Sequence, residues 1–411
     1  MLLWSIWLCG GEVSFVVTAD LHGRLDKLAL LAPEIKRYPE AVKVDLGDFF
    51  QGNFEVISRN GMPVIEVFND LNYDILIPGN HDLEHPVRGI SGWHKLFRGK
   101  ILTGQWELSG FATSAATVVT RGQYRIGVIA LGDVGLKKRR RCWDELVYRD
   151  EVQTACQAAD FLRGKCDAMV LMGHISTGNY PVISAILKAV PEIVAVAGAH
   201  SHRHLPGGII RNALVVQPGA YAESAVLLKL HFDDRTGKFT HAVSKLILPG
   251  KSADKKLLDN WEKLQEQCAA EGKTVLAEFR NVEQFGRICA RIVRQAVGAQ
   301  MAIVCFDPGR FQPLMNSRGL FRIFPYGNRI TLVKADKMVV DKFLKKRKRK
   351  NEKFFVSGNA VDGVFTLAVS DYIFLREPLL RHLPGKITPF FERQTIESGF
   401  STGKTGEIRA E

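Results

Sequence analysis

The stretch YDILIPGNHD, residues 73–82, runs from an apolar segment directly into three polar side chains. Residues 73–77 predict a short buried strand, so that Asn80, His81 and Asp82 fall just beyond its end. One explanation is a tight turn, because Gly79-Asn80 is favourable turn chemistry. The other is a functional site at the edge of a sheet. The rest of the chain decides between them.

Apolar runs of this kind recur through the first 230 residues, with helical patterns such as 26–37 and 152–163 between them. Near-continuous apolar strands separated by helices predict an α/β layered fold in which both sheet faces are covered. The runs are 13–20, 41–48, 73–80, 126–133, 167–174, 193–200 and 214–220.

The pattern changes after residue 224, where apolar and polar residues alternate along segment 225–248. The turn-rich DDRTGK within this segment predicts a hairpin, which would close the first domain. A polar amphipathic helix with Ser252 as its N-cap follows, and another helix is expected at 281–297. The predicted division is an apolar N-terminal segment 1–12, a large α/β domain 13–250, a connector helix 251–275 and a smaller mixed α/β domain 276–411.

Composition narrows the class of protein. The chain has 411 residues, 46% of them hydrophobic, and no apolar run of the roughly 18 residues that a membrane span needs. Its net charge of +13 includes the runs KKRRR at 137–141 and KKRKRK at 345–350, which favour anionic partners. The N-terminal apolar segment lacks a basic n-region and a small-residue cleavage site, so it is a poor signal peptide as it stands. The seven cysteines are scattered, form no CxxC and predict no disulfide framework.

Polar residues of one kind follow five of the apolar runs. Strands that emerge at one edge of an α/β sheet bring their C-terminal ends together, so these side chains should meet. In extended segments residues i and i+2 face the same side, so Asp20 and His22 can point at one ion, and His200 and His202 can do likewise if their segment stays extended. Each short motif alone is more often a cap or a turn. The order of the motifs and their uniform placement after apolar runs are what indicate a functional site. The candidate ligands are Asp20, His22, Asp48, Asn80, His174, His200 and His202.

Oxygen and imidazole donors of this kind suit Zn, Mn or Fe rather than thiophilic metals. Seven side chains are too many for one ordinary ion. They fit two divalent ions that share a bridging carboxylate at the ~3.5–4 Å spacing of two-metal hydrolytic sites.

The series DLHGRLD, DLGDFFQGN, PGNHDLEH, MGHIST and AGAHSHRH resembles the calcineurin-like metallophosphoesterases, and within them the 5′-nucleotidase branch. The resemblance covers residues 13–248 and includes the segment LVVQPGAYAES that follows the last histidines. It implies a four-layer αββα sandwich as the catalytic domain, followed by a smaller mixed α/β domain for substrate specificity.

The resemblance also implies roles. Asp20, His22, Asp48 and His202 would hold one metal, and Asp48, Asn80, His174 and His200 the second. His81 would face the substrate phosphate as a general acid, oriented by an Asp82 carboxylate–imidazole bond. A hydroxide that bridges the metals would release phosphate from a nucleotide. The residues after strand 73–77 would thus belong to a site rather than to a plain turn.

The smaller domain resembles the branch only faintly. Residues 298–310 are similar to a segment of the branch that ends in an arginine, and Arg310 falls at that position. Residues 353–361 are similar to the region that carries one aromatic base clamp, which makes Phe354 or Phe355 a candidate. Both phenylalanines also fit as core residues. A Gly-Gly-Asp-Gly-aromatic loop usual in the branch is replaced by REPLLRHLPG. Substrate selection by this domain is therefore the least specified part of the prediction.

Two alternatives stay open. The same metal chemistry fits a phosphodiesterase of cyclic nucleotides or of another small phosphoester. The basic runs also permit a non-catalytic protein that binds anionic partners, although no regular aromatic–basic interleaving indicates a specific nucleic-acid platform. The expected partner is a small phosphorylated molecule, most simply a nucleotide. The resemblance favours the periplasm or cell envelope, whereas unpaired cysteines also fit the cytoplasm.

Overall fold

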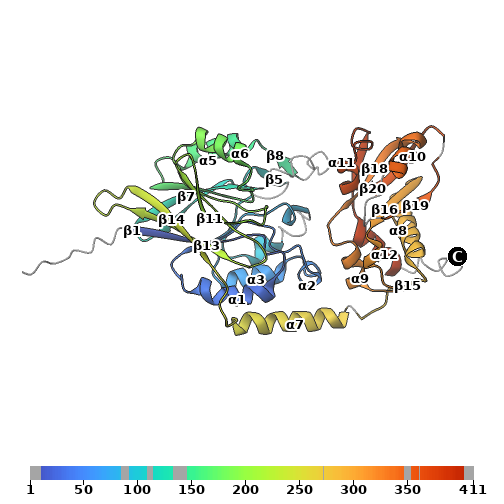
Figure 1. Cartoon of the computed structure of the whole chain (residues 1–411), viewed down its shortest axis with the longest axis horizontal. Helices are drawn as coiled ribbons and strands as arrows, with labels where there is room; N and C mark the ends of the chain where they lie inside the picture. The colour runs from blue at the N-terminus through green and yellow to red at the C-terminus, as the bar shows by residue number, and fades with distance from the viewer. Residues whose placement is uncertain are drawn as a thin grey trace, which may run out of the picture. The chain divides into compact units, whose positions relative to one another are not determined.

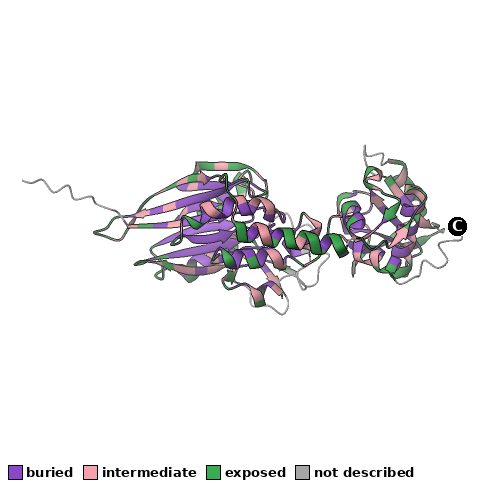
Figure 2. Cartoon of the chain, turned by 90° about the horizontal axis from the view of Figure 1, so that it is seen from below, coloured by how far each residue is buried: buried purple, intermediate pink, exposed green. Residues whose placement is uncertain are grey.

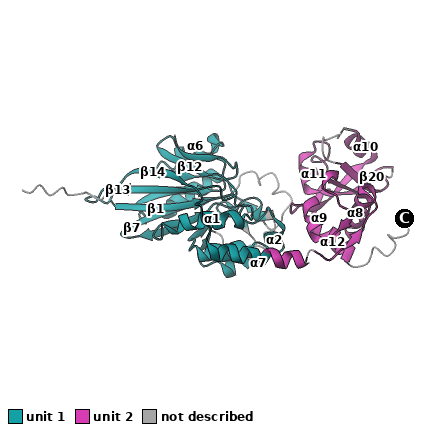
Figure 3. Ribbon diagram, turned by 60° about the horizontal axis from the view of Figure 1, so that its bottom comes forward, with its two compact units in different colours: residues 1–140, 144–264 teal, residues 141–143, 265–411 magenta. Residues whose placement is uncertain are grey.

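The computed structural model describes residues 11–84, 92–108, 114–132, 146–271, 273–346, 353–360 and 362–401. The chain forms two compact units, residues 1–140 with 144–264, and residues 141–143 with 265–411 (Figure 3). The boundary falls inside helix α7 (Lys255–Glu271). The four-part division made from the sequence stays a prediction. Both basic runs fall wholly or largely outside the described residues.

The first unit contains two six-stranded sheets. In the first sheet β1 to β4 run parallel, while β13 and β14 form the antiparallel hairpin that the sequence predicts for 225–248. Its strands, in sheet order, are β14 (Phe239–Ile247), β13 (Ala225–Phe232), β1 (Gly11–Thr18), β2 (Val42–Asp45), β3 (Ile75–Leu76) and β4 (Lys100–Ile101).

The second sheet has four parallel central strands, and an antiparallel strand at each edge. Its strands, in sheet order, are β11 (His204–Ile210), β12 (Ala213–Pro218), β10 (Ile193–Ala197), β9 (Ala168–Gly173), β7 (Tyr124–Leu131) and β6 (Ala116–Arg121). Strands β5 (Trp106–Leu108) and β8 (Leu146–Tyr148) pair separately.

The two sheets pack face to face over one apolar core. Alternate residues of the facing strands fill it, for example Phe15, Val128 and Met172, and their full burial is the main stabilising contribution at about 1.5–3 kcal/mol per large side chain. Helices α5 (Glu151–Leu162) and α6 (Tyr180–Ala189) form a second core against the outer face of the second sheet. Helices α1 (Leu25–Lys36) and α3 (Met62–Asp70) lie along the outer face of the first (Figure 1).

This arrangement is an αββα sandwich, and the fold class predicted from the sequence is confirmed. Figure 2 shows buried residues concentrated along the strands of this unit and exposed residues on the outer sides of its helices. The short helices α2 (Phe54–Ile57) and η1 (Asp82–Glu84) follow strands β2 and β3.

Helix α7 begins under a cap that the sequence analysis assigned wrongly. Asp254, rather than Ser252, accepts the Leu257 N–H at 3.1 Å, because the helix begins three residues after Ser252. The same residue ties the helix to the first unit, since its backbone N–H donates to the Ala29 carbonyl at 2.7 Å. An ion pair between Lys256 and Asp70 at 2.8 Å adds a surface contact to α3.

The second unit is built on one five-stranded mixed sheet, with helices on both faces. Helices α8 (Val282–Ala296), α9 (Ser317–Ile323) and α12 (Glu392–Ser401) share one core, and α10 (Lys337–Lys346) and α11 (Asp371–Arg376) share the other. The strands, in sheet order, are β19 (Lys353–Gly358), β16 (Met301–Phe306), β20 (Val364–Ser370), β18 (Arg329–Asp336) and β21 (Gly385–Phe391); β15 (Ala277–Glu278), β17 (Leu314–Met315) and η4 (Pro308–Arg310) stand outside it.

Two further expectations concern the chain as a whole. Among the described cysteines, Cys156, Cys166 and Cys289 are free thiols, while Cys9 and Cys142 lie outside the described residues. Within the described residues, no helix is both long enough and apolar enough to cross a membrane.

Candidate functional site

The predicted ligands lie on the turns that leave the carboxyl ends of β1, β2 and β3 in one sheet and of β9 and β10 in the other. The first two turns are joined by backbone hydrogen bonds: Asp20 N–H to the Gly47 carbonyl at 2.8 Å, His22 N–H to the Asp48 carbonyl at 2.9 Å, and Gly23 N–H to Phe49. Two strands that are adjacent and parallel therefore deliver their ligands together.

Most of the ligand positions have an uncommon backbone conformation. The φ angles of five lie between 49° and 69°, the left-handed region that non-glycine residues seldom adopt. Such strain persists where the surrounding structure holds it, and it gathers at functional sites. The segments are not extended at these positions. The five residues are Asp20, His22, Asp48, His200 and His202.

The side chains nevertheless converge into two groups. In each, one potential ligand atom per residue lies within 4.8 Å of the others. His200 and His202 fall into different groups, because their segment is not extended and the condition for both to face one ion is not met. One group is Asp20, His22 and His202, and the other is Asp48, His174 and His200.

Hydrogen bonds to the backbone fix the buried imidazoles. His22 Nδ1 bonds the Gln51 carbonyl at 2.6 Å, which leaves Nε2 facing His202 Nε2 at 3.2 Å. His174 Nδ1 bonds the Leu46 carbonyl at 2.7 Å, which leaves its Nε2 facing His200 Nδ1 at 3.3 Å. A metal-binding histidine commonly has its second nitrogen held in this way.

Asp48 lies close to His174 within the second group, and Asn80 lies next to that group. Asp48 Oδ2 lies 3.2 Å from His174 Nε2, and Asn80 Oδ1 lies 2.9 Å from His200 Nδ1. The other oxygen of Asp48 accepts the His81 backbone N–H at 2.8 Å. Gly79 allows this close approach, since a Cβ there would stand 2.2 Å from Asp48 Oδ1.

The donor set fits divalent cations. Asp20 Oδ1 is buried without a hydrogen-bond partner among the described residues, yet it faces His202 Nε2 at 3.5 Å and His174 Nε2 at 3.9 Å. Nitrogen and oxygen atoms that converge in this way, with an acceptor left unpaired in a buried position, are what a cation would satisfy.

Burial and neighbouring charges shift the pKa values of these groups in different directions. Burial, reinforced by the nearby Asp48 carboxylate, raises the pKa of Asp20 to about 7. Burial opposes ionisation of Asp48, but His174 and His81 outweigh it and hold the pKa of Asp48 below its usual range. Burial, followed by the charge on His22, lowers the pKa of His202 to about 4, so its imidazole is neutral and can act as a ligand.

Asp82 accepts hydrogen bonds from the backbone. Its Oδ2 accepts the Asp48 and Gly79 N–H groups at 2.6 and 2.8 Å, and its Oδ1 accepts the Phe49 N–H at 3.2 Å. Both oxygens thus accept backbone N–H groups, and Asp82 holds the two turns together. The carboxylate–imidazole bond to His81 stays a prediction. Burial, followed by Asp48, raises the pKa of Asp82 to about 7.

The site has a buried floor and an open side. Asp20, Asp48 and His174 are buried, whereas His200 is exposed and His81 is half-buried. The His81 ring lies beside the first group, with its centroid 5.7 Å from that of His22. A ligand from solvent would therefore meet His81, His200 and the edge of each group first.

Two residues with contacts to the site were not singled out from the sequence. The Tyr221 ring packs 5.4 Å from that of His22 and 5.2 Å from that of His202, and its N–H donates to the Asp20 carbonyl at 2.8 Å. Gln217, fully buried, bonds both Thr177 and Ser201. Both lie in the QPGAY segment, whose similarity to the branch was the one available signal.

The candidate residues of the second unit differ in availability. Phe355 is 2% exposed and stacks on Phe306 at 4.6 Å, so it is a core residue and the suggestion that it clamps a base is wrong. Phe354 is half-buried, with its ring edge-on to Phe343. Arg310 is exposed on η4, where it donates to the Arg322 carbonyl at 3.2 Å.

Comparison with known proteins supports the geometry. The family model of the calcineurin-like phosphoesterases matches residues 13–204. The chain is 23% identical to bovine 5′-nucleotidase over 348 residues, which cover 69% of this chain and 60% of the relative. It is also 23% identical to human 5′-nucleotidase, with 70% and 61% covered. The match thus spans about three fifths of the length of these relatives.

Solved structures share the fold. A Staphylococcus aureus protein assigned as a 5′-nucleotidase superposes with a TM-score of 0.72 at 15% identity, with 95% of this chain and 97% of that chain covered. The 5′-nucleotidase precursor of Thermus thermophilus gives a TM-score of 0.64 at 17% identity, with 95% and 96% covered. Residues 13–204 are therefore similar to the calcineurin-like phosphoesterases, the longer match at 23% identity is to 5′-nucleotidases, and the solved structures show a shared fold.

Proposed function

We propose that this protein is a metal-dependent phosphoester hydrolase that releases phosphate from nucleoside 5′-phosphates. The observation that carries the proposal is the pair of ligand groups around Asp20 and Asp48, each of which combines carboxylate and imidazole donors. In this proposal Asp20, His22, Asp48 and His202 hold one divalent cation, and Asp48, Asn80, His174 and His200 hold the other.

The cations, Mn, Zn or Fe, would supply a nucleophile at neutral pH and neutralise charge on the phosphoryl oxygens. The chain's own residues would do the rest. His22 and His174 stay oriented through their backbone bonds, so that these two side chains do not have to reorganise during the reaction. In this proposal His81, which is half-buried with its ring beside that of His22, binds a phosphoryl oxygen and gives a proton to the leaving oxygen.

The nucleotide specificity is the less supported part of the proposal. It rests on the similarity to the 5′-nucleotidases and on the exposed Arg310 of the second unit. Phe354 is the aromatic side chain of the candidate clamp that keeps partial exposure. A phosphodiesterase of cyclic nucleotides would use the same metal site, because that site contacts phosphate and not the base.

Phosphate release by the manganese-supplemented protein from 5′-AMP, an aryl phosphate and cyclic AMP tests the proposal. We expect preference for 5′-AMP, and a loss of roughly 100-fold or more in Asp48→Asn, since even outer partners of metal ligands cost 10–100-fold. Metal analysis should find about two ions per chain in the parent. The matched control Asp160→Asn changes an exposed aspartate on α5 and should retain activity.

The other outcomes discriminate between functions. Activity on cyclic AMP or the aryl phosphate alone would contradict the nucleotidase specificity but would still support a metal-dependent hydrolase. The protein could also bind metal but release no phosphate from any of the three substrates in a way that depends on Asp48. That result would contradict the proposed hydrolase activity and favour a binding protein.

A further inference from the structure

A hollow of 470 Å³ lies in the second unit between helix α8 and the edge strand β19. The helix approaches the strand closely because residue 286 is a glycine: a Cβ there would stand 2.1 Å from the Phe355 ring. This packing leaves the polar face of α8 beside the outer side of β19. The lining residues are Arg280, Asn281, Gln284, Arg287, Ile288, Arg291, Val356 and Ser357.

The lining is strongly positive. Three of its side chains are arginines and none is acidic. Arg287 and Arg291 stand four residues apart on α8, so they project from the same face of the helix. No carboxylate in the described parts of the chain forms an ion pair with Arg280 or Arg287. The nearby Glu283 pairs instead with Lys353.

The remaining polar groups add donors to the hollow. Asn281 Oδ1 caps the helix by accepting the Gln284 N–H at 2.9 Å, and Gln284 Oε1 accepts the Arg280 N–H at 2.8 Å. Because their oxygens are engaged, both amides present NH₂ groups. The N-terminal end of this 15-residue helix adds a partial positive charge. Arg294, which does not line the hollow, donates from Nε to Oγ of the lining residue Ser357 at 3.2 Å.

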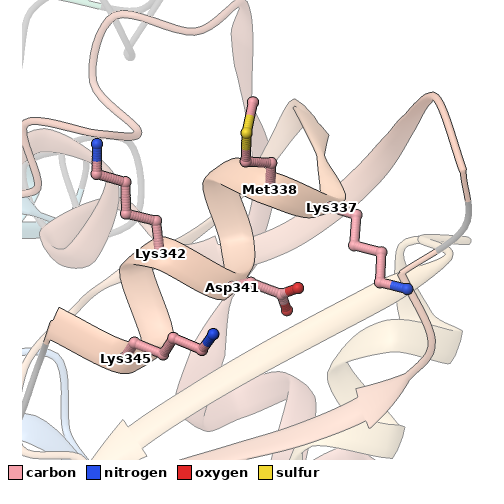
Figure 4. A pocket seen from close by; sticks show the side chains of 5 residues that line it. All are labelled: Lys337, Met338, Asp341, Lys342 and Lys345. Atoms are coloured by element: carbon pink, nitrogen blue, oxygen red, sulfur yellow. The ribbon is translucent and has the colours of Figure 1, made fainter.

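A second hollow, of 710 Å³, lies on α10 and also has three cationic side chains, but their arrangement differs (Figure 4). Its five lining residues come from a single helix, include Asp341, and spread away from one another. It therefore offers no converging set of donors.

We infer that the hollow between α8 and β19 binds a soluble small molecule that carries two or more linked phosphoryl groups, such as a nucleoside diphosphate or triphosphate. Planar guanidinium groups bind phosphate oxygens through paired, charge-assisted hydrogen bonds. Two arginines on one helix face and a third before the helix match more than one phosphoryl group. Ile288 and Val356 supply an apolar wall for the rest of the ligand. The site shares no residue with the proposed metal site, Arg310 or Phe354, so the ligand would be an effector or a second bound nucleotide.

Calorimetric titration of the full chain in EDTA tests this inference, because removal of divalent cations suppresses hydrolysis and metal-bridged binding in the first unit. The probes are inorganic phosphate, pyrophosphate, ADP and ATP. We expect pyrophosphate, ADP and ATP to bind and inorganic phosphate to bind at least tenfold more weakly. Arg287→Ala should weaken ADP binding roughly tenfold or more, as loss of a charge-assisted bond does. Arg381→Ala, which removes one exposed charge elsewhere in the unit, should leave the affinity unchanged.

Three results would overturn the inference. The first is absence of binding by the parent protein. The second is equal ADP affinity in Arg287→Ala and the parent, which would locate the binding elsewhere. The third is a single-stranded oligonucleotide that binds more tightly than ADP and depends on Arg287, which would make the hollow part of a nucleic-acid surface. None of these results bears on phosphate release, which is measured with metal, so failure here and failure of the proposed hydrolase remain distinguishable.

Discussion

The proposed metal ligands are held by residues that are not ligands themselves. Asp48 has a left-handed backbone, with φ of 54°, and its turn is fixed by the buried carboxylate of Asp82 and by the close approach of Gly79. The identity of the ligands could be predicted from the sequence, because Asp, Asn and His recur after apolar runs. The left-handed turns could not, since nothing local distinguishes Asp20 or His200 in such a turn from the same residue in an extended one.

Gly79 provides a test of this support. In Gly79→Ala the new methyl group would meet Asp48 Oδ1 at 2.2 Å and Asp48 N at 2.6 Å, so the carboxylate has to move. We expect metal content to fall below about two ions per chain and phosphate release to drop by roughly 10–100-fold, as for other residues that orient ligands. Gly208→Ala is the control, because its methyl group would meet neighbours at 3.8 Å or more. Equal metal content and turnover in both variants would contradict the supporting role.

His81 and Asp82 are adjacent in the sequence, but their contacts predict different effects. His81→Ala should lower turnover by about 10²–10⁴-fold, the range for a general acid, with little change in stability. Asp82→Asn puts an NH₂ group where one carboxylate oxygen accepts backbone N–H groups. It should cost about 1–3 kcal/mol in the free energy of unfolding for a buried donor left unpaired, and lower turnover as well. Urea unfolding measures the change in stability and initial rates measure the change in turnover, so the two variants can be distinguished. An Asp82→Asn protein of unchanged stability would show that the three bonds matter little.

At the level of elements, the long and strongly patterned segments were the predictable ones. The hairpin 225–248 appears as β13 and β14, and the helix expected at 281–297 appears as α8 under its Asn281 cap. The start of α7 was misassigned, because Ser252 and Asp254 are both good N-caps and only the contact of Asp254 with α1 decides between them. Phe355 was ambiguous for a similar reason: its burial depends on Gly286, which is distant in the sequence.

The junction of β21 and α12 contains a buried acid that should make stability depend on pH. Burial, followed by the neighbouring Asp371 carboxylate, raises the pKa of Glu392 from its ordinary 4.5 to about 8. Between these values the folded chain keeps a proton that the unfolded chain has released. The contribution of Glu392 to the free energy of unfolding therefore falls as the pH rises from about 4.5 to 8.

Glu392→Gln mimics the protonated side chain, so this variant should lose less stability than the parent between pH 5 and pH 8 and should be the more stable protein at pH 8. Urea unfolding of the second unit at the two pH values measures the difference. Glu397→Gln, on the same helix, should behave as the parent does. Parallel pH dependences in the parent and Glu392→Gln would exclude a protonated Glu392.

For the whole molecule, the fold class could be predicted because the strand-and-helix alternation and the resemblance agree. The composition of each core could not be predicted, because it depends on which strands face each other across the two sheets. The described apolar clusters each belong to one unit: two lie before residue 250 and two after residue 275. Cores that share no residues favour units that unfold separately.

Metal binding should therefore stabilise only the first unit. A cation that binds the folded state alone adds about 2.7 kcal/mol when its free concentration is 100 times Kd, which corresponds to roughly 5–10 °C for a unit of this size. Differential scanning calorimetry with manganese or with EDTA should show one transition that moves and one that does not. Asp48→Asn should abolish most of the shift, since it changes the carboxylate proposed to serve both ions, whereas Asp160→Asn should keep it. Movement of both transitions together would show that the units are coupled, and no movement in the parent would contradict the metal site that the proposed hydrolysis requires.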